Sequence, residues 1–301
     1  MPAYNSRAHI ADAIRSVVAQ TYDAWELVVV NDGSTDDTAA IVAGLGLPSG
    51  RLSYLETANA GVGAARNRAI ERATGALVAF LDADDIWEPA KLERQVEVMR
   101  DGDFDVVFSD YHLIGEAARR ADEVPSGAYR AQEMFRLLFE RNSVPLISVM
   151  ARREAVIAAG MFLESGDLAR YGEDYELWLR MADGGSAFFA MPDRLVRYRP
   201  HRDLEAHRPL VTRLDTDLRV VLRFADRMAA LDAAGCRSRI AGLYNLVAAA
   251  RAGAGDIAGA RRALAELGAF EPPWRVRVKA ALLLLLRRRY AAWYGRLLRR
   301  G

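Results

Sequence analysis

Three carboxylates that could bind a metal ion directly follow an apolar segment of the chain. Residues 76–81 read Ala-Leu-Val-Ala-Phe-Leu, and Asp82, Asp84 and Asp85 come next. Carboxylate oxygens are the ligands that Mg²⁺ and Mn²⁺ prefer, and such ions are often shared with the phosphates of a substrate. An acidic turn that ends a strand and starts the next helix would give the same pattern, so the spacing alone leaves both interpretations open.

The apolar segment predicts a strand that is buried on both faces, which is typical of a parallel sheet covered by helices. If the strand continues, Asp82 and Asp84 point to the same side. A second apolar segment, residues 25–30, ends in the same way at Asp32. Asp32 could accept hydrogen bonds from a base or a ribose, although Asn-Asp-Gly is also a common turn. Ligands of such sheets bind beyond the carboxyl ends of the strands, where both acidic segments are expected.

A loop and two further segments carry candidate residues. Residues 59–63, Asn-Ala-Gly-Val-Gly, lead into a predicted helix that carries Arg66. Free backbone N–H groups and an arginine at a helix start can bind an anion, although the loop matches neither the Walker nor the dinucleotide pattern. Glu173 and Asp174 begin another predicted helix, where plain capping is the alternative because the helix dipole favours carboxylates. His201 follows the last predicted strand, and an isolated histidine is more often incidental than a ligand.

Strand and helix patterns alternate through residues 1–205, which predicts an α/β nucleotide-binding fold. The predicted strands are residues 25–30, 52–55, 76–81, 105–108, 144–150, 187–191 and 194–198. The predicted helices are residues 9–19, a helix that continues through 41–42, and residues 64–73, 89–100, 132–140, 152–159 and a helix that begins at 173.

The composition limits the possible functions. Lys and Arg number 41 against 40 Asp and Glu, so no net charge calls for nucleic acid as a partner. Cys236 is the single cysteine, which excludes an intramolecular disulfide and fits a reducing compartment. No signal-peptide pattern follows Met1, and no segment reaches the roughly 20 apolar residues that span a bilayer. We therefore expect a protein on the cytoplasmic side, soluble or peripheral to the membrane.

The character of the chain changes after about residue 205. Residues 206–301 are rich in Ala, Leu and Arg with helical spacing, which predicts an all-α region. Residues 240–267 resemble one helical hairpin of the tetratricopeptide type. Residues 274–300 combine leucines and aromatic residues with eight arginines. This composition suits a basic amphipathic helix on an anionic membrane, and a core-facing helix with a solvated arginine face is the equal alternative.

Taken together, these motifs resemble the family 2 glycosyltransferases, and the resemblance covers residues 1–205. Each motif is short, but their joint order is specific. In chain order they are Pro2-Ala3-Tyr4-Asn5, residues 28–36, Asn59-Ala60-Gly61 with Ala65-Arg66-Asn67, Phe80-Leu81-Asp82-Ala83-Asp84-Asp85, Glu173-Asp174 with residues 177–180, and Tyr198-Arg199-Pro200-His201. The resemblance implies the GT-A fold, which is an α/β Rossmann-like, mixed and mostly parallel sheet flanked by helices, here with an all-α extension.

The resemblance also implies inverting transfer of a sugar from a nucleotide-sugar donor to an acceptor hydroxyl. By analogy, the acceptor would be a cell-envelope glycan or a lipid-linked glycan. Asp174 would be the catalytic base, and Mn²⁺ or Mg²⁺ would bind to Asp82, Asp84 and His201. The residues implied in substrate binding are Pro2, Ala3, Tyr4, Asn5, Asp32, Gly61, Arg66, Asp82 and Glu173.

One expectation concerns the start of the chain. Members of the family have an apolar strand just before Pro-x-Tyr-Asn, and Met1 stands at the position of its last residue. That strand is central in the implied sheet, so its absence would leave neighbouring strands with unpaired backbone groups. We therefore expect the natural chain to begin upstream of Met1.

Two alternatives compete with a glycosyltransferase. Haloacid dehalogenase-type phosphatases also place Asp-x-Asp after an apolar strand. There, however, the motif follows the first strand, and Thr or Val usually stands where this chain has Ile86. The second alternative is an interaction protein that uses the helical tail and keeps the α/β part as an inactive scaffold.

Overall fold

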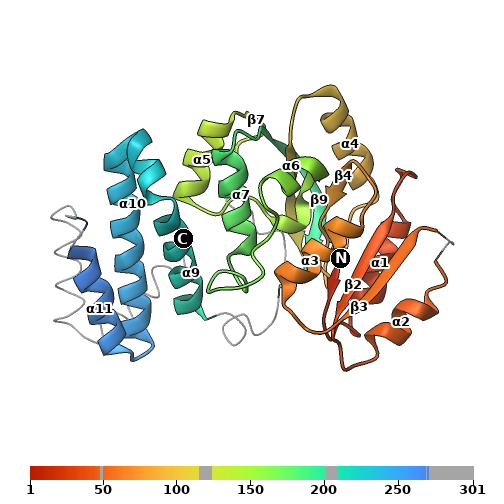
Figure 1. The fold of residues 1–301 in the computed structure, drawn as a ribbon, viewed down its shortest axis with the longest axis horizontal. Coiled ribbons are helices and arrows are strands. Elements are labelled where there is room, and N and C mark those ends of the chain that lie inside the picture. The colour runs from red at the N-terminus through yellow and green to blue at the C-terminus, as the bar shows by residue number, and fades with distance from the viewer. Residues whose placement is uncertain (48–49, 115–123, 201–208, 269, 271–301) are drawn as a thin grey trace. The chain divides into compact units, whose positions relative to one another are not determined.

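The computed structural model describes residues 1–47, 50–114, 124–200, 209–268 and 270 (Figure 1). The chain divides into two compact units, Met1–Pro200 and His201–Gly301. The first unit alternates strands and helices, and the described part of the second unit is helical.

The strands of the first unit are β1 (Pro2–Ala3), β2 (Leu27–Asp32), β3 (Leu52–Thr57), β4 (Leu77–Ala79), β5 (Ile86–Trp87), β6 (Val106–Leu113), β7 (Gly127–Tyr129), β8 (Met150–Arg152) and β9 (Phe188–Tyr198). Its helices are α1 (Ile10–Val18), α2 (Thr38–Gly44), α3 (Val62–Arg72), α4 (Lys91–Asp101), α5 (Ala131–Glu140), the 3₁₀ helix η1 (Leu146–Ser148), α6 (Arg153–Ala158) and α7 (Glu173–Asp183).

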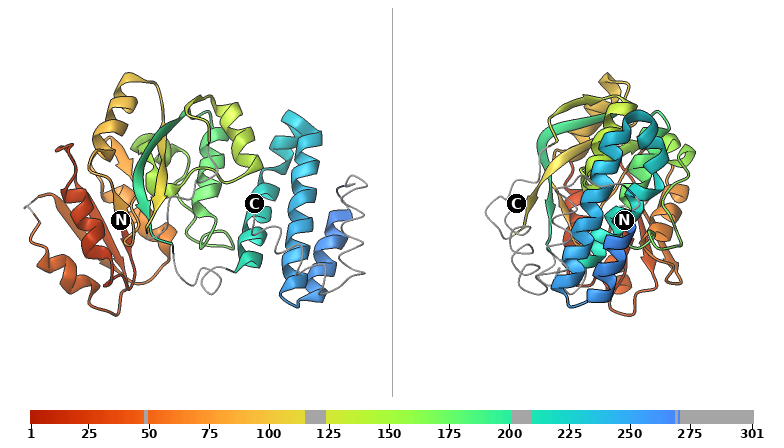
Figure 2. Two further views of the ribbon diagram at one scale, coloured as in Figure 1. Left: turned by 180° about the vertical axis from the view of Figure 1, so that it is seen from behind. Right: turned by 90° about the vertical axis from the view of Figure 1, so that its left-hand side faces the viewer.

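The strands form two sheets, which confirms the predicted α/β class. The first sheet has the order β1-β2-β3 and is parallel throughout. The second has the order β4-β8-β6-β9-β5, with β7 paired to β9. In it, β6 and β9 are parallel and the other pairs are antiparallel. Figure 2 shows this sheet from behind, where the long strand β9 runs beside β6.

Four predicted strands differ in the structure. The apolar segment 76–81 is hydrogen-bonded as a strand only at Leu77–Ala79, because the chain then turns through the acidic residues. The predicted strand 144–150 is instead η1 followed by β8.

The two short strands predicted around residues 192–193 are one strand, β9. Its pairing with β6 is irregular between Ser109 and Tyr111. Pro192 lies in β9 opposite this irregularity and has no N–H to donate. The strand is therefore irregular there but does not end.

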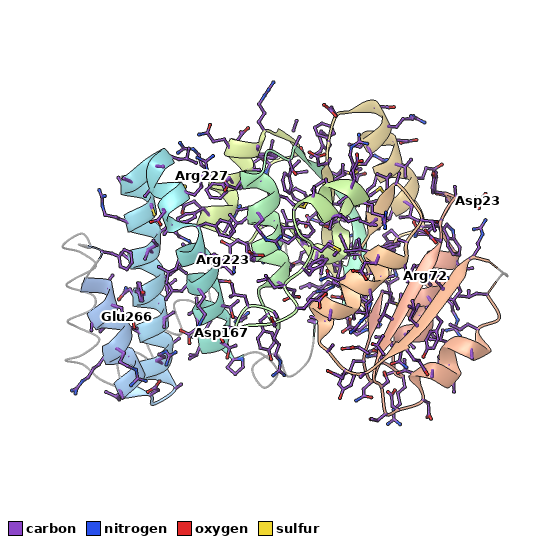
Figure 3. The ribbon with its side chains drawn as sticks, viewed as in Figure 1. Asp23, Arg72, Asp167, Arg223, Arg227 and Glu266 are labelled. Carbon is purple, nitrogen blue, oxygen red and sulfur yellow. The ribbon has the colours of Figure 1, made fainter. Side chains whose placement is uncertain are left out.

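Both faces of β2 are buried, as its unbroken apolar sequence predicts. Val29 belongs to the large core with Ile10 and Ile14 of α1, while Val28 and Val30 pack with Ala65 of α3. At the other end of α3, Arg72 (labelled in Figure 3) donates from Nε to Ser53 Oγ on β3 over 3.1 Å. These contacts fix α3 against the first sheet.

The N-terminal residue is buried beside β2. The ammonium group of Met1 donates to the carbonyl oxygen of Val28 over 2.8 Å, and burial lowers its pKa to about 5. A cavity of about 490 Å³ lies next to it, lined by residues of β2, β4 and α4, among others. Nothing in the structure tests whether residues precede Met1, so that expectation stays a prediction.

The described part of the second unit contains α9 (Leu210–Arg223), α10 (Ala225–Gly253) and α11 (Ile257–Gly268). Asp232 interrupts α10 with an extended backbone, and its Oδ1 accepts a hydrogen bond from Gly235 N over 2.9 Å, as a cap does. The helices α10 and α11 are consecutive and contact one another in the region where the hairpin is predicted. The predicted basic helix 274–300 lies outside the described residues. Within the described residues, none of the helices is long and apolar enough to span a bilayer.

Candidate active site

The acidic residues after β4 lie in a turn. The N–H of Asp85 donates to the carbonyl oxygen of Asp82 over 3.2 Å, so alternation along a strand does not decide where these side chains point. Asp82 and Asp84 are partly exposed, whereas Asp85 is only 1% exposed. The turn therefore presents two carboxylates at the surface and keeps the third inside.

Asp85 anchors the segment that follows β9. Its Oδ1 accepts a hydrogen bond from the N–H of Arg199 over 2.7 Å, and Arg199 Nε donates to the carbonyl oxygen of Asp84 over 2.9 Å. Burial, together with the charges of Asp82 and Asp84, raises the pKa of Asp85 to about 8. His201 lies outside the described residues, but the chain leading to it is fixed against the acidic turn.

Arg66 connects this turn to the start of α7. Its guanidinium donates from one terminal nitrogen to Asp82 Oδ1 over 2.8 Å and from the other to Glu173 Oε1 over 2.7 Å. Burial would lower the pKa of Arg66, but the two carboxylates outweigh it and the pKa is raised. The bridge brings together residues that lie more than a hundred positions apart in the sequence.

Glu173 and Asp174 differ in their surroundings although they are neighbours. Glu173 is 5% exposed, and burial together with the charge of Asp174 raises its pKa to about 7. Asp174 is partly exposed, and its Oδ1 accepts a hydrogen bond from the N–H of Tyr175 over 2.7 Å. Asp174 is thus the more accessible of the two carboxylates at the start of α7.

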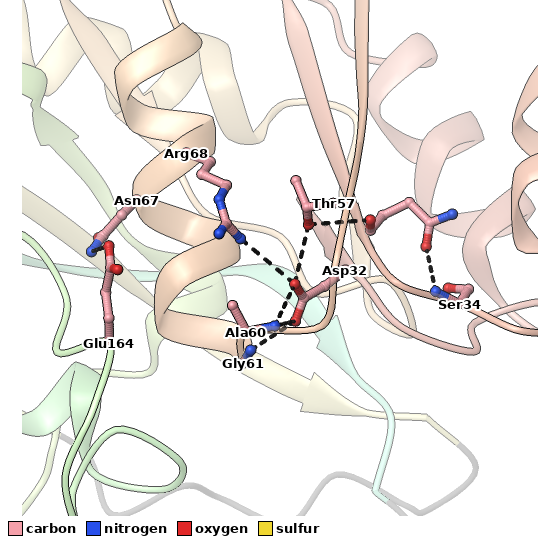
Figure 4. Close-up of polar contacts among 9 residues, drawn as sticks. Asp32, Ser34, Thr57, Ala60, Gly61, Asn67, Arg68 and Glu164 are labelled. Atoms are coloured by element: carbon pink, nitrogen blue, oxygen red, sulfur yellow. Dashed lines mark hydrogen bonds and ion pairs between the residues drawn. The ribbon is translucent and has the colours of Figure 1, made fainter.

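A second group of predicted residues surrounds Asp32 at the end of β2 (Figure 4). The buried carboxylate accepts hydrogen bonds from Thr57 Oγ1 (3.2 Å), Ala60 N (3.0 Å) and Gly61 N (2.8 Å). Arg68 lies 3.7 Å from it. Gly61 has a φ of +96°, a conformation that favours glycine, and it directly precedes α3. Asp32 therefore organises the loop that begins α3.

The Pro2–Asn5 motif lies beside the same turn. Asn5 N donates to Ser34 Oγ over 2.9 Å, and Asn5 Oδ1 accepts from Thr35 N over 2.8 Å. The large side chain of Tyr4 is 54% exposed to solvent. The structure thus brings the first two sequence motifs together at the carboxyl ends of β1 and β2.

Sequence reasoning did not identify the role of Asn67. Its side-chain amide donates to Glu164 over 2.8 Å, and both residues are labelled in Figure 4. The amide also donates to the carbonyl oxygen of Phe162 over 2.9 Å, and Asn67 Oδ1 accepts from Phe162 N over 2.9 Å. Asn67 therefore holds the loop that leads to α7. The motif Ala65-Arg66-Asn67 includes it, but only the tertiary structure gives it partners.

Comparison with known proteins identifies the family. The glycosyl transferase family 2 model matches residues 1–156, which is more than half of the chain. The chain belongs to glycosyl transferase family 2. This membership favours the glycosyltransferase interpretation over the phosphatase and interaction-protein alternatives.

Several relatives of this family 2 protein are known. A putative teichuronic acid biosynthesis glycosyltransferase, TuaG of Bacillus subtilis, is 32% identical over 206 residues, which covers 66% of this chain and 76% of TuaG. The UDP-Glc:alpha-D-GlcNAc-diphosphoundecaprenol beta-1,3-glucosyltransferase WfgD of Escherichia coli is 40% identical over 115 residues, or 38% of this chain and 45% of WfgD. The chain spans only 26 to 30% of the length of three matching glycosyltransferases from Rickettsia species.

A solved structure shares the fold. The mannosyltransferase PcManGT from Pyrobaculum calidifontis, in complex with GDP-Man and Mn²⁺, superposes with a TM-score of 0.59 at 22% identity. The match covers 94% of this chain and 85% of that one. At this identity the likeness supports the predicted GT-A fold and nothing finer.

The donor set at the acidic turn of this family 2 protein fits a divalent cation. Asp82 and Asp84 offer two partly exposed carboxylates, and an ion shared with a diphosphate needs only one or two from the protein. Across the described ranges, no group of three or more His, Cys, Asp and Glu side chains is placed to hold a metal ion. The third predicted ligand, His201, falls outside those ranges.

Proposed function

We propose that this protein is an inverting glycosyltransferase that moves a sugar from a nucleotide-diphosphate sugar to an acceptor hydroxyl. The observation that carries the proposal is the Arg66 bridge, which places the acidic turn at Asp82 beside Glu173 and Asp174 at the start of α7. The acidic turn can then hold the leaving diphosphate, while the start of α7 holds a base for the acceptor.

Asp174 is the proposed catalytic base. A hydroxyl oxygen attacks the anomeric carbon as its proton passes to the Asp174 carboxylate, and the bond to the diphosphate oxygen breaks. Attack from the face opposite the leaving group inverts the anomeric carbon. Glu173 is the weaker candidate, because it is buried and bonded to Arg66.

Asp82, Asp84 and His201 are the proposed ligands of Mn²⁺ or Mg²⁺. When bound, the ion would act as a Lewis acid that stabilises negative charge on the leaving diphosphate. Arg199 donates to the backbone of the acidic turn. It would therefore hold the segment that leads to His201 next to Asp82 and Asp84.

The nucleoside is proposed to bind where the first two motifs meet. Pro2, Ala3, Tyr4 and Asn5 lie beside the turn that contains Asp32, and Gly61 begins α3 next to it. An aromatic ring that is half exposed, as Tyr4 is, can stack on a base. Asp32 would contribute mainly by shaping the loop, because its carboxylate already accepts three hydrogen bonds.

The acceptor is proposed to be a glycan or a lipid-linked glycan of the cell envelope. The names of TuaG and WfgD point to such acceptors, and the name of the PcManGT complex points to a nucleotide-sugar donor with Mn²⁺. The arginine-rich segment 274–300 would bring the enzyme to an anionic membrane surface, where a lipid-linked acceptor resides. Nothing in the composition calls for nucleic acid.

A thermal-shift experiment tests this function. UDP- and GDP-sugars are added with and without Mn²⁺ to the full chain, to Asp84→Ala, and to the control Asp101→Ala at the exposed end of α4. We expect one donor to raise the melting temperature only with Mn²⁺, in the wild type and the control but not in Asp84→Ala. The absence of any shift in folded wild-type protein would count against the proposal.

A further inference from the structure

The guanidinium of Arg66 is enclosed by protein, and its Nε is buried and has no hydrogen-bond partner within the described residues. One terminal nitrogen is bonded to Asp82 and the other to Glu173, and the side chain is only 5% exposed. The guanidinium carbon also lies 5.5 Å from the centre of the Phe162 ring. A group enclosed in this way cannot turn toward a diphosphate without breaking its hydrogen bonds to Asp82 and Glu173.

We propose that Arg66 is a positioning residue, which orients the Asp82 carboxylate for the cation, and that it is not a contact of the donor diphosphate. This inference rests on the proposed function, because it concerns the same site. It replaces the role in substrate binding that the sequence motif implied for Arg66.

The physical basis is the geometry of the bridge. A planar guanidinium can bond two carboxylates at once in fixed directions, whereas an ammonium cannot reproduce this geometry. Arg66 lies in α3 and donates to Asp82 Oδ1. The position of α3 therefore sets the orientation of the Asp82 carboxylate. Groups that orient metal ligands typically change metal affinity by about 10- to 100-fold when they are altered.

Glu173 holds Arg66 in this position. It holds the other end of the guanidinium through Oε1, and within the described residues its Oε2 has no hydrogen-bond partner. The hydrogen bond from Arg66 to Oε1 therefore links the Glu173 carboxylate to the acidic turn. A change at Glu173 should shift Arg66 and, through it, the Asp82 carboxylate.

The test uses Arg66→Lys, which keeps the positive charge and loses the two-sided geometry. Mn²⁺ binding to the full chain is measured by electron paramagnetic resonance without nucleotide. Binding of UDP and of GDP is measured separately in EDTA. We expect Arg66→Lys to weaken Mn²⁺ binding about tenfold and to leave the nucleotide affinity in EDTA unchanged. Unchanged Mn²⁺ affinity, or weaker nucleotide binding in EDTA, would overturn the proposal.

A matched control is Arg153→Lys. Arg153 donates from Nε to the carbonyl oxygen of Ile70 over 2.8 Å, so it also fastens α3, but at the far end of the helix. The Arg153→Lys variant should lose some stability and keep its Mn²⁺ affinity. An equal loss of Mn²⁺ affinity in both variants would mean that general loosening of α3 is responsible, and the positioning role would be rejected.

A second pair of variants keeps the proposal testable if Arg66→Lys does not fold. Glu173→Gln and Glu173→Ala remove the same charge, but only the glutamine can still accept the hydrogen bond from Arg66. We expect weaker Mn²⁺ binding in Glu173→Ala than in Glu173→Gln, and equal binding in the two would contradict the bridge. If the wild type bound neither Mn²⁺ nor nucleotide, the proposed function would fail as well, so the two failures are distinguishable.

Discussion

At the scale of single residues, Lys91 is a buried cation that no described carboxylate neutralises. The side chain is fully buried; its Nζ donates to Gln95 Oε1 over 2.6 Å and lies 4.2 Å from the centre of the Trp87 ring. Burial lowers the pKa of Lys91 to about 7. In the unfolded chain the same group should titrate near its ordinary pKa of about 10.4.

The stability of the protein should therefore depend on pH through Lys91. Between about pH 7 and 10 the unfolded state holds the proton and the folded state has lost it, so the free energy of unfolding rises with pH. The slope from this group is at most about 1.4 kcal/mol per pH unit. Below pH 7 both states are protonated and this contribution is constant.

Urea unfolding of wild type and Lys91→Met from pH 6 to pH 9.5 measures the effect. We expect the variant to be the more stable protein near pH 6, and the advantage to shrink as the pH rises. The methionine keeps the length and apolar stem of the side chain without the charge. A difference in pH dependence between the two proteins therefore reports on the charge and not on packing. Parallel stability curves for the two proteins would show that Lys91 does not titrate in this range.

Asp174 gives a second prediction at this scale. Asp174→Asn removes the proton acceptor but leaves the acidic turn and the bridge to Glu173 in place. Because general base catalysis contributes about 10²- to 10⁴-fold, we expect kcat to fall by that factor with little change in donor affinity. Asp183→Asn at the other end of α7 is the control and should keep normal turnover. A kcat for Asp174→Asn near that of the wild type would assign the base elsewhere.

At the scale of elements, the site depends on how closely the loop after α6 approaches α3. Gly63 is buried in the first turn of α3, and a methyl group there would overlap the carbonyl oxygen of Leu163. Asn67 holds the same loop one turn later. The loop in turn leads to Glu173, so α3 fixes both the acidic turn and the start of α7.

Gly63→Ala should therefore destabilise the protein although alanine favours helices. Overpacking of this kind typically costs about 1–3 kcal/mol, more than the roughly 0.5–1 kcal/mol that alanine contributes in a helix. The control is Gly242→Ala in α10, where nothing lies within 4 Å of the added methyl group and stability should stay equal or rise. The melting temperatures of the two variants are compared with that of the wild type. The same change in both would contradict the close contact between Gly63 and Leu163.

At the scale of the whole molecule, the C-terminal segment is proposed to bind a membrane surface. Deleting residues 269–301 removes the eight arginines of segment 274–300. Each basic residue near an anionic surface contributes about 1 kcal/mol, so we expect the deletion to abolish sedimentation with phosphatidylglycerol vesicles. Neutral phosphatidylcholine vesicles and high salt should abolish it for the full chain too. If the truncated protein bound anionic vesicles as well as the full chain, the segment would not be the anchor.

Local patterns in the sequence predicted much of this protein. The buried strand β2, the helices α1, α4 and α5, the acidic turn and the helical hairpin each follow from residues that are close in the chain. Hydrophobic periodicity and turn chemistry are local properties, which is why they can be recognised there. The predictions were wrong where a local pattern suited two structures, as in the apolar segment 144–150, which became a 3₁₀ helix and a short strand.

Only the tertiary structure decided which charged groups meet. Arg66 and Glu173 are far apart in the sequence, and no local pattern links them. Lys91 is a charged residue in the first turn of α4, yet its side chain is fully buried. Asp85 resembles its two acidic neighbours, yet it alone is inside and holds Arg199. The sequence alone thus determined the types of catalytic and binding groups available, because those depend on residue identity. Their partners, burial and pKa values depend on the path of the chain through space, because charges interact across the fold.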